Sequence, residues 1–230
     1  FPNSMHLLLF DIDGTLVRVN GTGRTAVMQA LSSVTDRPIS TDDVPFSGRT
    51  DPAIFEAVLK KNGVAQAEAT VDEAIDAYVE AMQSALTAAD VEVLPGVRSL
   101  LSELNDHPDV HLGLVTGNVE PIAYKKLSVH GLDDYFPVGA FGSDHADRNH
   151  LPELATRRAA QHTGHAFRPA DHAVVIGDTA HDIECARAAG ARAGAVCTGR
   201  YNHAELSPHD PDWLLDTLPA PDSFLQRILD

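Results

Sequence analysis

The chain has 230 residues, 43% of them hydrophobic, which is enough to build one large or two modest globular domains. Seventeen basic and 33 acidic residues give a formal net charge of −16, which argues against nucleic acid or anionic membrane surfaces as partners. With two cysteines and no apolar run near the roughly 20 residues of a membrane span, we expect a cytoplasmic chain that is a monomer or small homo-oligomer.

The first predicted element is an apolar strand, residues 7–10, that ends in two carboxylates. Asp11 follows it directly, and Asp13 comes one residue later, before Gly14. The strand end directs Asp11 into a crevice, and Gly14 permits a sharp turn that returns Asp13 to the same place. The spacing suits one aspartate that attacks and one that moves protons. Alternatively, Asp13-Gly14 is only a turn and Asp11 only caps a helix.

A long helical segment follows before the next apolar run, residues 112–115. It has about 100 residues, whereas a βα loop usually has about two to six. Two apolar stripes at helical spacing lie within it, at 54–59 and 75–86. We therefore predict an inserted α-helical cap domain at residues 17–93, and an α/β core formed by residues 5–16 and 94–230. Hinges are expected at 17–21 and 94–97.

The second apolar run, residues 112–115, leads into Thr116-Gly117-Asn118. A hydroxyl, exposed backbone amides and a side-chain amide before a helix are a favourable arrangement for phosphate oxygens. The alternative is that Thr116 or Asn118 simply caps the helix.

The third run, residues 173–176, leads into Gly177-Asp178 and then Asp182 at the start of a helix. Mg²⁺ prefers a few carboxylates together with waters and phosphate oxygens, so Asp11, Asp178 and the Asp13 carbonyl form a plausible partial shell. Asp182 would bind through water. Alternatively, Asp178 is a turn residue and Asp182 only an acidic residue at a helix N-terminus.

The remaining elements complete an alternating pattern. Two shorter strands are predicted at 137–141 and 193–197, and helices near 97–105, 120–130, 152–164 and 182–189. Continuous apolar strands indicate a parallel sheet that is covered on both faces. We therefore expect an α/β fold with a doubly wound, mostly parallel, Rossmann-like sheet, whose carboxyl edge brings Asp11, Thr116 and Asp178 together.

In this order, the three strand-end motifs and the helical insertion resemble the haloacid dehalogenase superfamily, in its phosphoglycolate-phosphatase-like branch. The resemblance implies that Asp11 is the nucleophile and Asp13 the general acid and base. It further implies that Thr116 donates to phosphate, that Asp178 binds Mg²⁺ and that Asp182 supports the metal. Because the dehalogenases lack the second aspartate of the first motif, Asp13 favours phosphate ester chemistry.

One part of the family pattern is missing, since the third motif usually carries a lysine and no lysine follows Lys126. We predict that Arg148, after the strand at 137–141, binds the phosphate instead, because arginine can hold it bidentately. Arg157, Arg158 and Arg168 are the alternatives.

The expected substrate is a small phosphorylated metabolite, which Arg49 in the cap is predicted to contact. Arg49 lies beside Gly48, where a helix is expected to begin, although it could equally be a solvated surface arginine. Two other functions stay open. One is a phosphomutase of the β-phosphoglucomutase type, which Thr116-Gly117-Asn118 slightly disfavours, and the other is a non-catalytic phosphate-binding module.

Overall fold

A computed structural model describes residues 5–65 and 68–229 of the chain. The predicted cap range therefore includes two residues, 66 and 67, that lie outside the described part, and the core range includes one, 230. In the part described, a parallel sheet has the strand order β5-β4-β1-β6-β7-β8. Its strands are β1 (His6–Phe10), β4 (Val110–Val115), β5 (Gly139–Ala140), β6 (Ala173–Gly177), β7 (Arg192–Val196) and β8 (Trp213–Leu215). The predicted α/β, doubly wound class is confirmed.

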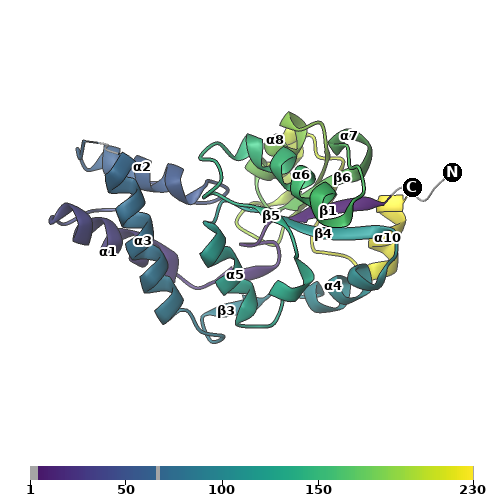
Figure 1. Ribbon diagram of the computed structural model, residues 1–230, viewed down its shortest axis with the longest axis horizontal. Coiled ribbons are helices and arrows are strands. Elements are labelled where there is room, and N and C mark those ends of the chain that lie inside the picture. The colour runs from purple at the N-terminus through teal and green to yellow at the C-terminus, as the bar shows by residue number, and fades with distance from the viewer. Residues whose placement is uncertain (1–4, 66–67, 230) are drawn as a thin grey trace.

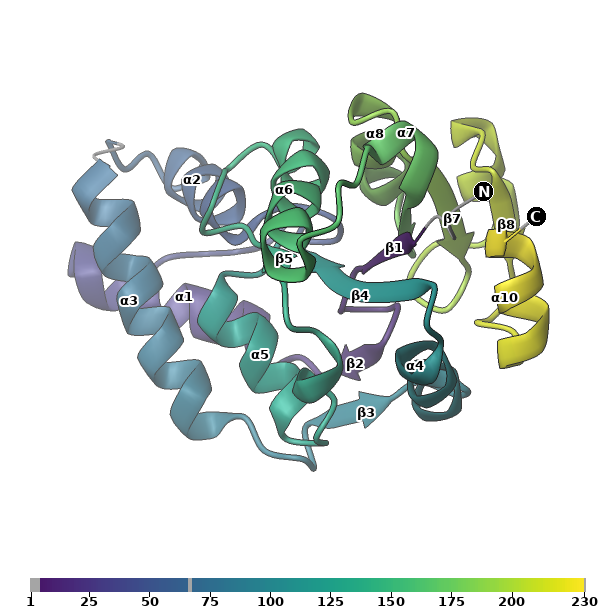
Figure 2. The same cartoon turned by 45° about the vertical axis from the view of Figure 1, so that its right-hand side comes forward.

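The central strand β1 shows why these apolar runs form a sheet covered on both faces. Its side chains alternate between two hydrophobic clusters, with Leu8 and Phe10 in one and Leu7 and Leu9 in the other, and all four are fully buried. The first cluster includes residues of α4 (Val97–Asp106), α5 (Glu120–Ser128) and α10 (Pro221–Leu229). The second includes residues of α6 (Leu151–Thr163) and α8 (Ala180–Ala188). Figure 2 shows helices on both sides of the strands.

Most predicted elements of the core occur within a few residues of their expected bounds. The predicted strand at 137–141 is an exception, because only Gly139 and Ala140 pair with β4. The pattern also failed to predict β8 and α10, the last strand and helix of the described chain. β8 is half-buried at the sheet edge, so it lacks the continuous apolar run that marked the inner strands.

The helical insertion, which we define as residues 17–93, contains α1 (Thr22–Thr35), α2 (Asp51–Lys61) and α3 (Glu68–Ala85). Its helices pack on one another and lie beyond one end of the sheet (Figure 1). The chain enters and leaves it through a two-stranded antiparallel ribbon, β2 (Val17–Val19) and β3 (Val91–Val93). The predicted hinge at 17–21, where the chain enters the insertion, therefore begins as a strand. No helix in the described ranges is long and apolar enough to cross a membrane.

Candidate active site

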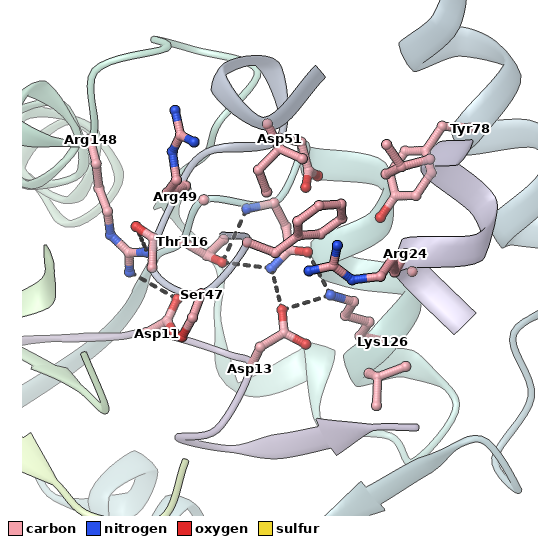
Figure 3. Close-up of a pocket in the computed structure, with 18 of the residues that line it drawn as sticks. Asp11, Asp13, Arg24, Ser47, Arg49, Asp51, Tyr78, Thr116, Lys126 and Arg148 are labelled. Carbon is pink, nitrogen blue, oxygen red and sulfur yellow. Dashed lines mark hydrogen bonds and ion pairs between the residues drawn. The ribbon is translucent and has the colours of Figure 1, made fainter. Parts of the chain in front are cut away.

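A cavity of about 300 Å³ lies between the carboxyl edge of the sheet and the helical insertion (Figure 3). The sheet side contributes six of the predicted site residues and Lys126. The insertion contributes polar residues at 47–51, Arg24 and an apolar wall. The lining residues used below are Asp11, Asp13, Arg24, Val27, Phe46, Ser47, Gly48, Arg49, Asp51, Ile54, Tyr78, Thr116, Gly117, Asn118, Lys126 and Arg148.

Asp11 follows the last residue of β1, and its backbone N–H continues the ladder by donating to the Ile176 carbonyl at 2.8 Å. The residue is 4% exposed and lines the cavity. Burial raises the pKa of Asp11 to about 7, although the nearby Arg148 guanidinium opposes this shift. A cation that binds this carboxylate would therefore favour the ionised form that can act as a nucleophile.

Asp13 returns to the cavity because the chain turns at Gly14, which has a φ of 84°. A Cβ at Gly14 would also lie 2.6 Å from Oδ2 of Asp178, so glycine is required there for both reasons. Asp13 Oδ2 accepts hydrogen bonds from Asn118 Nδ2 at 2.7 Å and from Lys126 Nζ at 2.6 Å. Both donors bind the same oxygen, which fixes the orientation of the carboxylate relative to Asp11.

The loop after β4 carries Thr116, Gly117 and Asn118 along the cavity wall. Thr116 is fully buried, and its Oγ1 accepts from the Asn118 side-chain amide at 2.8 Å. The Gly117 carbonyl accepts from the backbone N–H of Asp51 at 2.7 Å, which joins the loop to the helical insertion. Asn118 therefore acts mainly as a link between Thr116 and Asp13.

Asp11, Asp178 and Asp182 form the only cluster of three potential metal ligands among the residues described, with ligand atoms within 4.8 Å of one another. Within the same residues, no hydrogen-bond partner reaches the buried Asp178 Oδ1. Burial, together with the charges of Asp182 and Asp11, raises the pKa of Asp178 to about 9. A buried carboxylate oxygen without a donor is a suitable ligand for a hard cation, so the residues fit Mg²⁺.

Asp182 is more constrained than the other two aspartates. Its Oδ2 accepts from the N–H and the hydroxyl of Thr179 in a capping box at the start of α8. Its Oδ1 accepts from Arg148. Since both oxygens already have donors, Asp182 is better suited to contact a metal through water than directly.

Arg148, the predicted phosphate-binding residue, lies next to Asp11, whereas the three alternative arginines do not line the cavity. Its Nη2 lies 3.0 Å from Asp11 Oδ1 and also contacts Asp182, and its Nη1 donates to the Gly48 carbonyl at 3.0 Å. Burial disfavours its charge, but Asp182 and Asp11 outweigh this effect and raise the pKa of Arg148 above its ordinary value. A fixed positive charge therefore lies beside the predicted nucleophile.

The segment 48–51 fastens the helical insertion to the core. In addition to the bonds at Gly48 and Gly117, the Thr50 hydroxyl donates to the Ala146 carbonyl at 2.6 Å. The Asp51 carboxylate accepts from the backbone N–H of Val119 at 2.8 Å. Arg49 borders the cavity, but its side chain extends away from Asp11 and donates to the Ala53 carbonyl at 3.3 Å (Figure 3).

Sequence reasoning did not select three residues that line the cavity: Arg24, Asp51 and Lys126. Lys126 could have been identified from the helical pattern, because it falls on the buried face of α5 with Ile122 and Leu127. An unpaired lysine is unfavourable at such a position. Its Nζ donates hydrogen bonds to Asp13 Oδ2 and to Asn118 Oδ1, each at 2.6 Å. Nothing in the local pattern identified Arg24, because its position depends on how the insertion packs.

Comparison with known proteins finds one relative that this chain matches over less than half of the relative's length, and others that it matches over nearly their whole length. A Phytophthora nicotianae protein named imidazoleglycerol-phosphate dehydratase is 28% identical over 83% of this chain, which covers only 43% of that protein. A Nitrosococcus oceani phosphoglycolate phosphatase is 27% identical, with 92% of each chain covered. The pyrophosphatase PpaX of Bacillus cereus is 26% identical, with 93% of each covered.

Solved structures share the fold. A Haemophilus somnus protein described as a predicted phosphoglycolate phosphatase has a TM-score of 0.71 at 19% identity, covering 97% of this chain and 98% of its own. CbbY from Rhodobacter sphaeroides, in complex with phosphate, has a TM-score of 0.65 at 18% identity, covering 93% and 94%. The family model for haloacid dehalogenase-like hydrolases matches residues 8–196, which include every predicted site residue. The chain therefore belongs to the haloacid dehalogenase-like hydrolase family.

Proposed function

We propose that the chain is a magnesium-dependent phosphatase that hydrolyses a small phosphate monoester through an aspartyl-phosphate on Asp11. The observation that carries the proposal is the position of Asp11, which faces the cavity on one side and the Asp178–Asp182 pair on the other. The relatives named phosphoglycolate phosphatase and pyrophosphatase support it, because both names describe the hydrolysis of a phosphate compound.

Asp11, Asp178 and the Asp13 carbonyl would hold Mg²⁺, with Asp182 in contact through water. When bound, Mg²⁺ would neutralise charge on the phosphoryl group and so reduce its repulsion of an incoming carboxylate. The orphaned Oδ1 of Asp178 supports this ligand set, because a buried oxygen without a donor is costly unless a cation satisfies it.

The protein groups would divide the reaction between them. Asp11 attacks phosphorus, while Arg148 and Thr116 hold the phosphoryl oxygens in line. Asp13 gives its proton to the departing alkoxide and then takes one from the water that hydrolyses the aspartyl-phosphate. Because Asn118 and Lys126 both hold Asp13 Oδ2, the other oxygen, Oδ1, is the one assigned to these proton transfers.

The helical insertion is proposed to act as a separate cap domain at residues 17–93. Its residues Val27, Phe46 and Ile54 line the cavity opposite the catalytic aspartates, where they would exclude bulk water. The bonds of segment 48–51 to the core suit a closed state that opens to admit substrate.

Phosphate release from p-nitrophenyl phosphate tests the proposal, measured across a Mg²⁺ titration and again with EDTA. We expect Mg²⁺-dependent release by the wild type and none above background by Asp11→Asn. Substantial turnover by Asp11→Asn would refute the mechanism. If the wild type releases no phosphate from a broad ester panel yet still binds phosphate, it is a binding module. An isomerised sugar phosphate, formed without phosphate release, would indicate a phosphomutase.

A further inference from the structure

Four cations line the cavity, and one of them, Arg49, extends away from Asp11; the other three differ in how their charges are compensated. Arg148 is paired with Asp11 and Asp182, and Lys126 is paired with Asp13. Among the residues described, no carboxylate lies within salt-bridge distance of Arg24, the third cation. Figure 3 shows Arg24 extending into the pocket from α1, across from the sheet residues. The positive charge of Arg24 is therefore available to a bound molecule.

The position of Arg24 is fixed before any substrate binds. Its Nη1 donates to the Thr41 carbonyl and its Nη2 donates to the Val44 carbonyl at 3.0 Å. The guanidinium carbon lies 4.0 Å from the centroid of the Phe46 ring, on which it stacks. Two carbonyls and a ring hold the group in place without neutralising its charge, and the remaining N–H groups can still donate. Such a prearranged cation loses little conformational entropy on binding an anion.

Asp51 is the acidic residue that the helical insertion contributes to the cavity lining, and it already has partners. Its carboxylate accepts from the Val119 N–H, and the positive charge that acts on it most strongly is that of Lys126. Asp51 therefore does not substitute for an anionic partner of Arg24.

From these contacts we propose that Arg24 binds a second anionic group on the substrate, a carboxylate or another phosphate, carried by the leaving group. This inference rests on the proposed phosphatase function. A cavity of about 300 Å³ is at the lower end of ordinary small-molecule pockets, so it suits a phosphoryl group with a small leaving group that carries the second anion. Charge-assisted hydrogen bonds from an arginine would then select it over a neutral group of the same size.

Three esters of similar size test the assignment: 2-phosphoglycolate, 2-hydroxyethyl phosphate and O-phosphoethanolamine, with pyrophosphate as the phosphate-bearing substrate. We expect the wild type to prefer an anionic substrate over the neutral ester and to turn over O-phosphoethanolamine least. Arg24→Gln should lower kcat/KM for the preferred anionic substrate about tenfold more than for 2-hydroxyethyl phosphate. Comparing variants on the same substrate cancels differences in leaving-group reactivity. The anionic substrate with the larger loss identifies the group that Arg24 binds.

Arg37→Gln is the matched control, because it removes the same charge from an exposed position in the helical insertion outside the cavity. Its substrate preference should equal that of the wild type. A wild type that cleaves all esters without preferring an anion overturns the inference but leaves the phosphatase function intact, even if Arg24→Gln does not fold. Equal losses on anionic and neutral esters in a folded Arg24→Gln also overturn it. A wild type that releases phosphate from p-nitrophenyl phosphate but cleaves none of these substrates overturns the inference alone, whereas one that releases phosphate from neither refutes the phosphatase function itself.

Discussion

Replacing Lys126 with methionine is expected to slow turnover while leaving the protein folded. Lys126 Nζ donates to Asp13 and to Asn118, each at 2.6 Å, so methionine removes two donors that fix the proposed acid and base. Methionine fills similar space on the buried face of α5. The Asp13 side chain is 42% exposed, so water can solvate it once the lysine is gone. The thermal midpoint should therefore change by less than about 4 °C.

The expected size of the kinetic effect follows from the lost contacts. A hydrogen bond to a charged group contributes about 1.5–3 kcal/mol, and water recovers part of this at a half-exposed carboxylate. A barrier increase of about 1.5–3 kcal/mol lowers kcat by about 10- to 150-fold. Arg148 and Thr116, which are proposed to hold the phosphate, remain in place. KM should therefore change by less than about threefold.

Steady-state phosphate release at saturating Mg²⁺ measures both constants, and circular dichroism checks the fold. Lys125→Met is the matched control, because it makes the same change on the same helix at a residue that does not line the cavity. It should retain the wild-type kcat. If the folded Lys126→Met variant turns over within threefold of the wild type, the contact with Asp13 has no part in proton transfer.

Three further perturbations follow from the same contacts. Gly199→Ala places a Cβ into the space of the Asp178 carboxylate, so half-maximal activation should need about tenfold more Mg²⁺; an unchanged Mg²⁺ titration would contradict this. Arg148→Ala removes the buried cation beside Asp11, the proposed nucleophile, and kcat/KM should fall at least about tenfold; a smaller loss would count against phosphate binding by Arg148. Burial, with help from His162, lowers the pKa of His111, so the unfolded chain binds its proton first as pH falls. Urea unfolding should show stability falling below about pH 6.5, less steeply in His111→Phe, and equal slopes would contradict this.

The positions of the strand ends were readable from the sequence. Asp11, Thr116 and Asp178 each follow an apolar run, and parallel strands bring such ends to one edge regardless of how far apart they are along the chain. The long helical segment between the first two runs was evident for a similar reason, since no βα loop needs so many residues. Backbone geometry and local patterns alone were sufficient for the fold class and for the set of three aspartates.

Arg148 shows the limit of local information. Its chemistry and its place in the chain made it the best of four arginines, yet only the packing of α6 and α8 puts its guanidinium against Asp11 and Asp182. Arg49 and Arg24 show the same limit from the other side. Both are arginines of the helical insertion. Arg49 turns toward the first turn of α2, whereas Arg24 extends into the cavity.

What the sequence determined by itself is the chemistry at the sheet edge, because a strand end and the residue after it fix the direction of a short side chain such as that of Asp11. What only the tertiary structure decided is which long, flexible side chains join that site. Lys126 and Arg24 reach the cavity from helices whose placement depends on packing between distant segments. A long side chain can reach several places, and only the charges and carbonyls around it select one.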